Sequence, residues 1–232
     1  MIILADNTTS ILHFFLQGGI FMWPLITCSV VSLAVILVRG FALRRGRVIP
    51  RRIARGIEEL QPVDDADAVV KLARVVRGDE SALGRIVQTG LQNLQWPKAE
   101  NIQAVETRAR HEVVRLEAGL VVLEVVVGIA PLLGLLGAVS GLVNVFANFG
   151  ASSSISDPRG IAKGISEALS TTIVGLAIAI PSLIAYSYFS KKIETMSAEI
   201  ESLISELLAK CYYQKYRNPA FHAETDEVEE LM

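Results

Sequence analysis

The stretch IFMWPLITCSVVSLAVILV, residues 20–38, contains no charged residue and is long enough to cross a lipid bilayer as a helix. A helix rises about 1.5 Å per residue, so roughly 20 apolar residues match a hydrocarbon core about 30 Å thick. A cleaved signal peptide carries its basic residues in front of the apolar stretch. Here Asp6 precedes the stretch and the basic residues follow it. We therefore predict that residues 20–38 stay in the protein as a first transmembrane helix.

The residues after this stretch are strongly basic, which predicts the orientation of the chain. Loops rich in arginine and lysine stay on the cytoplasmic side of a membrane. We therefore expect residues 1–19 outside and residues 39–117 in the cytoplasm. The basic residues are Arg39, Arg44, Arg45, Arg47, Arg51, Arg52 and Arg55.

Two further apolar stretches cover residues 118–149 and 161–189. The segment 150–160 between them holds four serines, Asp157 and Pro158, as expected of a short outside loop. Lys191 and Lys192 follow the last stretch and place residues 190–232 inside. Hydrophobic residues make up 51% of the chain and mean hydropathy is +0.43, typical of a membrane protein. The predicted fold is an all-α polytopic membrane protein with three transmembrane helices.

The polar segments are predicted to form long helices that extend into the cytoplasm. No proline interrupts the chain between Lys98 and Pro131, so we expect one continuous helix to rise from the cytoplasm into the second span. After the third span, apolar residues recur at intervals of three and four and predict a face packed on a neighbouring helix. Beyond Arg217 the tail is acidic. The recurring residues are Ile193, Met196, Ile200, Leu203 and Leu207.

The composition argues against an enzyme, a metal site or a nucleic-acid partner. His13, His111 and His222 lie in three different regions, without clustered carboxylates or cysteines beside them. Cys28 falls in an apolar stretch and Cys211 in a polar helix, so we predict two unpaired thiols. A net charge of −2 provides no basic excess for nucleic acid. We expect no cofactor.

The second apolar stretch carries small and polar residues on one helical face, at intervals of three and four. Glycines on such a face let helices approach closely, and packing alone would explain them. The amides favour a hydrated or partner-facing surface instead, and both interpretations remain open. The residues are Gly134, Gly137, Gly141, Asn144 and Asn148.

The third apolar stretch contains Glu167, followed one turn later by Thr171 and Thr172. A carboxylate in an apolar span is costly, so it points to a protein interior, to water or to an ion pathway. The alternative is that Glu167, about two turns from the start of the stretch, simply reaches the outer interface. Glu124 lies near the cytoplasmic end of the second stretch, and we expect an interfacial position for it.

Two motifs resemble a known family. Residues 130–141, APLLGLLGAVSG, resemble the second-helix motif of the MotA/TolQ/ExbB proton-channel family. Residues 164–181, GISEALSTTIVGLAIAIP, resemble its third-helix motif more closely. Residues 18–25, GGIFMWPL, resemble the start of an ExbB-type chain. The resemblance covers all three spans in order.

The resemblance implies a pentamer that encloses two copies of a single-span partner of the ExbD/TolR type, which carries an ion-accepting aspartate. It implies that Glu167 is the pore-associated acid and that Thr172 lines the channel. Pro131 and Pro181 match positions that shape the two pore helices. The family commonly has threonine at the position of Ala138, and Ser140 and Thr171 are candidates to replace that hydroxyl. Asn144 belongs to the same expected pathway.

The implied function is a channel-forming subunit of an ion-driven motor that energises an envelope process such as TonB-dependent transport. Protons are the expected ion, and sodium stays open because two neighbouring threonines offer hydroxyl oxygens. A flagellar stator subunit would have four spans rather than three. A non-conducting scaffold and a self-contained transporter are the alternatives, although no internal repeat favours the latter.

Overall fold

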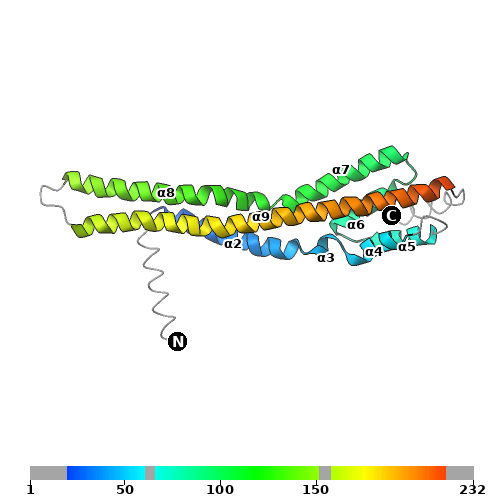
Figure 1. Ribbon diagram of the computed structural model, residues 1–232, viewed down its shortest axis with the longest axis horizontal. Coiled ribbons are helices and arrows are strands. Elements are labelled where there is room, and N and C mark those ends of the chain that lie inside the picture. Colours follow the sequence, from blue (N-terminus) through cyan, green and yellow to red (C-terminus); the bar gives the residue numbers. More distant parts are fainter. Residues whose placement is uncertain (1–19, 61–65, 152–157, 218–232) are drawn as a thin grey trace, which may run out of the picture. The chain divides into compact units, whose positions relative to one another are not determined.

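The computed structural model describes residues 20–60, 66–151 and 158–217, and all regular secondary structure in these ranges is α-helical (Figure 1). Three of the described helices are long and apolar enough to cross a membrane, over Met22–Ala42, Leu120–Ala147 and within Gly164–Tyr213. The predicted all-α fold with three membrane-spanning helices is thereby confirmed. The helices are α2 (Met22–Ala42), α3 (Arg45–Val48), α4 (Arg51–Glu59), α5 (Ala66–Val76), α6 (Ala82–Gln92), α7 (Lys98–Glu117), α8 (Leu120–Ala151) and α9 (Pro158–Arg217).

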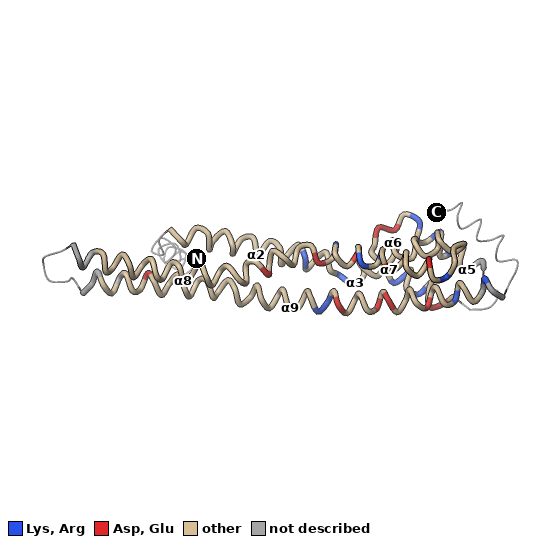
Figure 2. The backbone as a smooth tube through the Cα atoms, turned by 90° about the horizontal axis from the view of Figure 1, so that it is seen from above, with Lys and Arg blue, Asp and Glu red and all other residues tan. Residues whose placement is uncertain are grey.

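The chain divides into two compact units, each built from separate parts of the sequence. The apolar unit contains the residues up to Arg39 and Gly119–Tyr188, and the polar unit contains Gly40–Ala118 and the residues from Phe189. Figure 2 shows the charged residues gathered on α3 to α7 and on the second half of α9. The 60-residue helix α9 contributes to both units. Its apolar part, up to Tyr188, belongs to the apolar unit, and its polar part, from Phe189, belongs to the polar unit.

The core of the apolar unit is small and is shared by α2, α8 and α9. Most of the apolar surface lies outside this core. Only 11% of the first span's apolar window is buried within the chain, and only 33% of the second and third windows. Exposed apolar faces of this extent suit lipid or neighbouring membrane helices. The core residues are Met22, Leu25, Val126, Ala130, Val174 and Ala179.

The predicted continuous helix from Lys98 to Pro131 is wrong. Helix α7 ends at Glu117 and α8 begins at Leu120, with Ala118 and Gly119 in a turn. Glycine is a weak helix former, and the side chain of Arg39 occupies the space that a Cβ on Gly119 would need. Pro131 lies inside α8 without ending it.

The polar unit is a helical bundle around a conventional apolar core. The stripe predicted on α9 is confirmed, because its five residues, from Ile193 to Leu207, are all buried. Helix α6 is the most enclosed element, and the Oγ of Ser81 caps its first turn by accepting a hydrogen bond from the N–H of Gly84. Both cysteines are unpaired, as predicted. Burial raises the pKa of Cys211 to about 12, so this thiol is protonated at neutral pH.

The end of α9 is fixed to the rest of the polar unit by lysines and a tyrosine. The Nζ of Lys210 donates to the carbonyls of Ile57 and Glu58 at the end of α4, at 2.9 and 3.0 Å. The Nζ of Lys215 donates to the carbonyls of Leu94 and Gln95 just beyond α6, at 2.9 and 3.1 Å. The carbonyls of Ile57 and Glu58 belong to the last turn of α4 and have no partner within that helix, so Lys210 satisfies them and opposes the negative end of the helix dipole. Lys215 satisfies two carbonyls of the turn between α6 and α7.

Candidate functional site between helices α8 and α9

The glycines of α8 lie where α9 approaches most closely. A Cβ placed on Gly134 would lie 2.8 Å from the carbonyl oxygen of Thr171 and 3.1 Å from the Cα of Thr172. A Cβ on Gly137 would lie 2.9 Å from the Oγ1 of Thr171. A Cβ on Gly141 would lie 3.2 Å from the Cβ of Ala168. The two helices therefore touch through backbone at Gly134, and only glycine fits there without separating them.

Two threonine hydroxyls of α9 meet at this contact. Thr171 is 2% exposed, and its Oγ1 is 2.9 Å from the carbonyl of Ala168 and 3.3 Å from the carbonyl of Gly134. The Oγ1 of half-buried Thr172 is 3.3 Å from the same Gly134 carbonyl. Each hydroxyl has one proton and can donate to one carbonyl at a time. The result is a cluster of four oxygens, contributed by Thr171, Thr172, Gly134 and Ala168, inside an apolar pair of helices.

Glu167 is half-buried one helical turn before Thr171, on the same side of α9. It makes no hydrogen bond or ion pair with any residue whose side chain the structure describes. Lys163 precedes it by four residues, a spacing that places two side chains side by side on a helix, but its side chain is not among those described. Lys163 is not among the predicted site residues, although its spacing from Glu167 is visible in the sequence.

The other predicted site residues lie at different depths on the two helices. On α8, Ala138 and Ser140 are half-buried and Asn144 is exposed, whereas the side chain of Asn148 lies outside the described part. Pro131 is half-buried inside α8, and Pro181 is exposed inside α9. Glu124 is exposed on α8. The structure thus brings Gly134, Gly137, Gly141, Thr171 and Thr172 together, and it leaves Asn144 and Glu124 on outer faces.

A second polar contact inside the apolar unit was not predicted. The hydroxyls of Ser32 on α2 and Ser182 on α9 are 2.6 Å apart, and both side chains are buried. Ser182 also donates to the carbonyl of Ile178 at 2.7 Å, so Ser32 is the donor to Ser182 when that bond forms. The sequence shows that each of these two spans contains a hydroxyl group. It does not show that the two hydroxyls meet, because helix packing determines the partner of each.

Among the described residues of the polar unit, one carboxylate is buried. Glu112 on α7 is 1% exposed and bonds Arg85 on α6, with Nε of Arg85 2.8 Å from Oε1 of Glu112. Burial alone would raise the pKa of Glu112, but the hydrogen bonds from Arg85 and the charges of Arg85, Arg108 and Arg115 outweigh it. The pKa of Glu112 therefore lies below its usual value, and that of Arg85 is raised. This cluster fixes α6 to α7.

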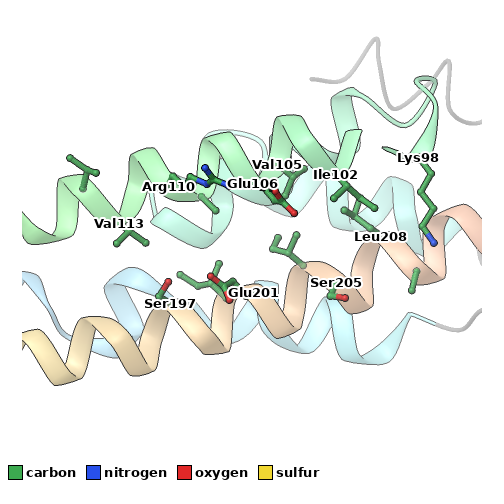
Figure 3. Close-up of a pocket in the computed structure, with 15 residues that line it drawn as sticks. Lys98, Ile102, Val105, Glu106, Arg110, Val113, Ser197, Glu201, Ser205 and Leu208 are labelled. Carbon is green, nitrogen blue, oxygen red and sulfur yellow. Dashed lines mark ion pairs between the residues drawn. The ribbon is translucent and has the colours of Figure 1, made fainter. Parts of the chain in front are cut away.

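The polar unit also contains a groove of about 910 Å³ between α7 and α9 (Figure 3). Its walls are mainly apolar, with Ile102 and Val105 from α7 and Ile204 and Leu208 from α9. Its charged lining residues balance, since Lys98 and Arg110 are matched by Glu106 and Glu201. No group of three or more histidine, cysteine or carboxylate side chains that could hold a metal occurs among the described residues.

These features define the class of protein: a three-span helical membrane protein whose second and third spans meet at a seam of glycines and hydroxyls. A family model described as the MotA/TolQ/ExbB proton channel family matches residues 79–202, which include α6, α7, α8 and the seam. The chain belongs to this family, as an ExbB-like member.

Individual relatives agree with this assignment. The chain is 34% identical to the biopolymer transport protein ExbB-like 1 of Synechocystis sp. over 183 residues, which cover 78% of this chain and 70% of that protein. It is 25% identical to the biopolymer transport protein exbB1 of Vibrio cholerae over 82% of this chain and 83% of that protein. It is 42% identical to ExbB of Helicobacter pylori over 82 residues, covering 35% of this chain and 56% of that protein.

Proposed function

We propose that this chain is the channel-forming subunit of an ion-driven motor in the bacterial inner membrane. Ions would pass along α8 and α9 and drive the movement of a single-span partner of the ExbD/TolR type. The observation that carries the proposal is the oxygen cluster of Thr171 and Thr172 at Gly134, with Glu167 one turn away, within residues matched to a proton channel family. Protons are the proposed ion, and sodium remains the alternative because the cluster consists of hard oxygen ligands.

The proposed assembly is a pentamer around two copies of the partner, with the N-terminus periplasmic and the C-terminus cytoplasmic. Two features support an assembly of this kind. Most of the apolar surface of the spans is unburied within one chain. The three predicted spans contain no aspartate, so an ion-accepting aspartate has to come from the partner. A TonB-like protein is a further proposed partner that would transmit force to the envelope.

The mechanism couples charge to rotation of the partner helix. A carboxylate in a low-dielectric interior resists ionisation, so protonation and deprotonation change its preference between dry and hydrated faces. An ion entering from outside would neutralise the partner's aspartate, and its release inside would restore the charge. The membrane potential supplies about 2.3 kcal/mol per charge per 100 mV, so several ions can drive one working stroke.

A non-conducting scaffold is the second candidate, and one observation favours it. The hydroxyl of Thr171 is enclosed and lies within hydrogen-bond distance of two carbonyls, and the glycines around it serve close packing. Such a seam would hold α8 against α9 without conducting ions. Under this alternative Glu167→Gln and Thr172→Val would leave function intact.

Native mass spectrometry of the chain, co-expressed with the ExbD/TolR-type protein of the same genome, tests the assembly. Five copies of the 25.2 kDa chain holding two copies of the partner would support the proposal. A monomer or dimer that does not retain the partner would contradict it.

A further inference from the structure

The arginines that follow the first span form an exposed patch on α3, α4 and the residues before them. Residues 39–55 contain seven of the chain's 15 arginines and no lysine, whereas the third span is followed by two lysines, Lys191 and Lys192. Six of the seven are exposed. One of these six, Arg45, is paired with Glu199, and we call the other five the arginine patch. The arginine patch consists of Arg44, Arg47, Arg51, Arg52 and Arg55.

One arginine beside the patch, Arg45, has an ion-pair partner within the fold, whereas the patch arginines have none among the described residues. Arg45 forms a bidentate ion pair with Glu199 on α9, and this hydrogen-bonded pair raises the pKa of Arg45. Arg44 lies over the ring of Phe41, with its Cζ 4.9 Å from the ring centroid. The patch arginines form no ion pair with any described residue. Their charges are available to a partner outside the chain.

The patch arginines of α4 alternate with buried apolar residues. Val48, Ile49, Ile53 and Ile57 are all buried in the polar unit, at 0–3% exposure, so the arginines between them face outward. Helix α4 does not gain stability from its own arginines. Arg51 and Arg52 lie in its first turn, where the helix dipole disfavours positive charge, and no side chain caps this end.

The connection to the first span limits how far the first two patch arginines can lie from the membrane surface. Helix α2 ends at Ala42, and Arg44 and Arg47 follow by two and five residues. At no more than about 3.6 Å per residue, these two guanidinium groups stay near the lipid headgroups at which α2 leaves the bilayer. Phosphate is an anion that arginine binds through paired N–H···O bonds.

We propose that the arginine patch is a binding site for anionic phospholipids of the leaflet at which α2 ends. Orienting the span requires only positive charge, which lysine would supply equally. A phosphate site instead requires the planar guanidinium group, whose paired donors match two phosphate oxygens. The all-arginine composition, the outward placement and the lack of internal ion pairs are accounted for together by this site.

The test is lipid retention by the full-length chain in detergent, measured by native mass spectrometry with added phosphatidylglycerol or phosphatidylcholine. We expect phosphatidylglycerol to be retained at about tenfold lower concentration than phosphatidylcholine, since each basic group near anionic lipid adds several-fold. The triple variant Arg44→Lys, Arg47→Lys, Arg51→Lys changes the three patch arginines nearest the end of α2 and keeps the charge needed for insertion. It should lose about tenfold in phosphatidylglycerol retention because lysine lacks the paired donors.

The matched control is Arg74→Lys, Arg77→Lys, Arg110→Lys, which changes three exposed arginines of the polar unit outside the patch. It should bind phosphatidylglycerol like the wild type. Equal retention of both lipids by the wild type, or a patch variant that binds like the wild type, would overturn the proposal. Displacement of the lipid by a peptide of residues 221–232, FHAETDEVEELM, would assign the patch to the acidic tail instead.

Discussion

Gly134 is a residue of the seam that leaves no room for a side chain. A methyl group there would meet the backbone of α9 at Thr171 and Thr172, which cannot rotate away as a side chain can. We expect Gly134→Ala to lower stability by about 1–3 kcal/mol, measured as thermal stability in detergent. Gly128→Ala is the matched control on the same helix, because nothing lies within 4 Å of its added Cβ. Equal stability of the two variants would show that α8 and α9 are not in contact at Gly134.

Glu112 makes the stability of the polar unit depend on pH. Its pKa in the folded chain lies below its usual value of 4.5, so its contribution is present above that value and is lost as the pH falls through the folded pKa. Glu112→Gln should therefore cost about 2 kcal/mol at neutral pH, and the difference from wild type should shrink below about pH 4.5. Thermal unfolding between pH 3 and pH 7 measures this difference.

The control for Glu112 is Glu106→Gln. Glu106 pairs only with Arg110, at 3.7 Å on an exposed surface. Exposed pairs contribute at most about 1 kcal/mol. A cost for Glu112→Gln that does not change with pH would refute the assigned ion-pair role and leave only a packing role.

The glycine face of α8 could be predicted from the sequence, but the contacts that it makes with distant residues could not. The spacing of Gly134, Gly137 and Gly141 predicted one face of a helix, and the structure places that face against α9. Sequence could not show that both threonine hydroxyls meet at the same Gly134 carbonyl. The Ser32–Ser182 contact was missed for the same reason, since 150 residues separate the partners.

At the scale of helices, two lysines of α9 hold other segments in place. Lys210 bonds carbonyls at the end of α4, and Lys215 bonds carbonyls that follow α6. We expect Lys210→Met to loosen the end of α4 and Lys215→Met to loosen the residues after α6, each by about 1–2 kcal/mol, because carbonyls there lose a charged donor. Hydrogen exchange of the amides in these segments measures the effect. Lys191→Met is the control, since Lys191 pairs only with exposed Glu194. Unchanged exchange in Lys210→Met and Lys215→Met would refute the capping role.

Hydropathy predicted the number of spanning helices, whereas the residues at which helices end were harder to predict. Apolar length alone identifies a span, because a bilayer core requires about 20 apolar residues. The break at Ala118–Gly119 was not predicted, because glycine breaks a helix only when the surroundings favour it. Here Arg39 lies beside Gly119, a contact between residues 80 positions apart. The apolar stripe of α9 was predictable because its spacing is local.

At the scale of the whole molecule, a single chain leaves most of its membrane surface apolar and uncovered. The first span is the extreme case, with 11% of its window buried within the chain. Neither the number of copies nor the partner follows from one sequence, because both depend on contacts between chains. Ion conduction is therefore best tested on the assembled complex rather than on the chain alone.

The decisive measurement is ion flux into proteoliposomes that contain this chain together with its ExbD/TolR-type partner, driven by a membrane potential. We predict flux in the wild type and a loss of at least about tenfold in Glu167→Gln and in Thr172→Val, because intramembrane polar groups serve ion pathways. Glu194→Gln and Thr195→Val, on the exposed polar part of α9, should conduct like the wild type. Wild-type flux in both seam variants, or no flux in the complete complex, would contradict the channel and favour the scaffold.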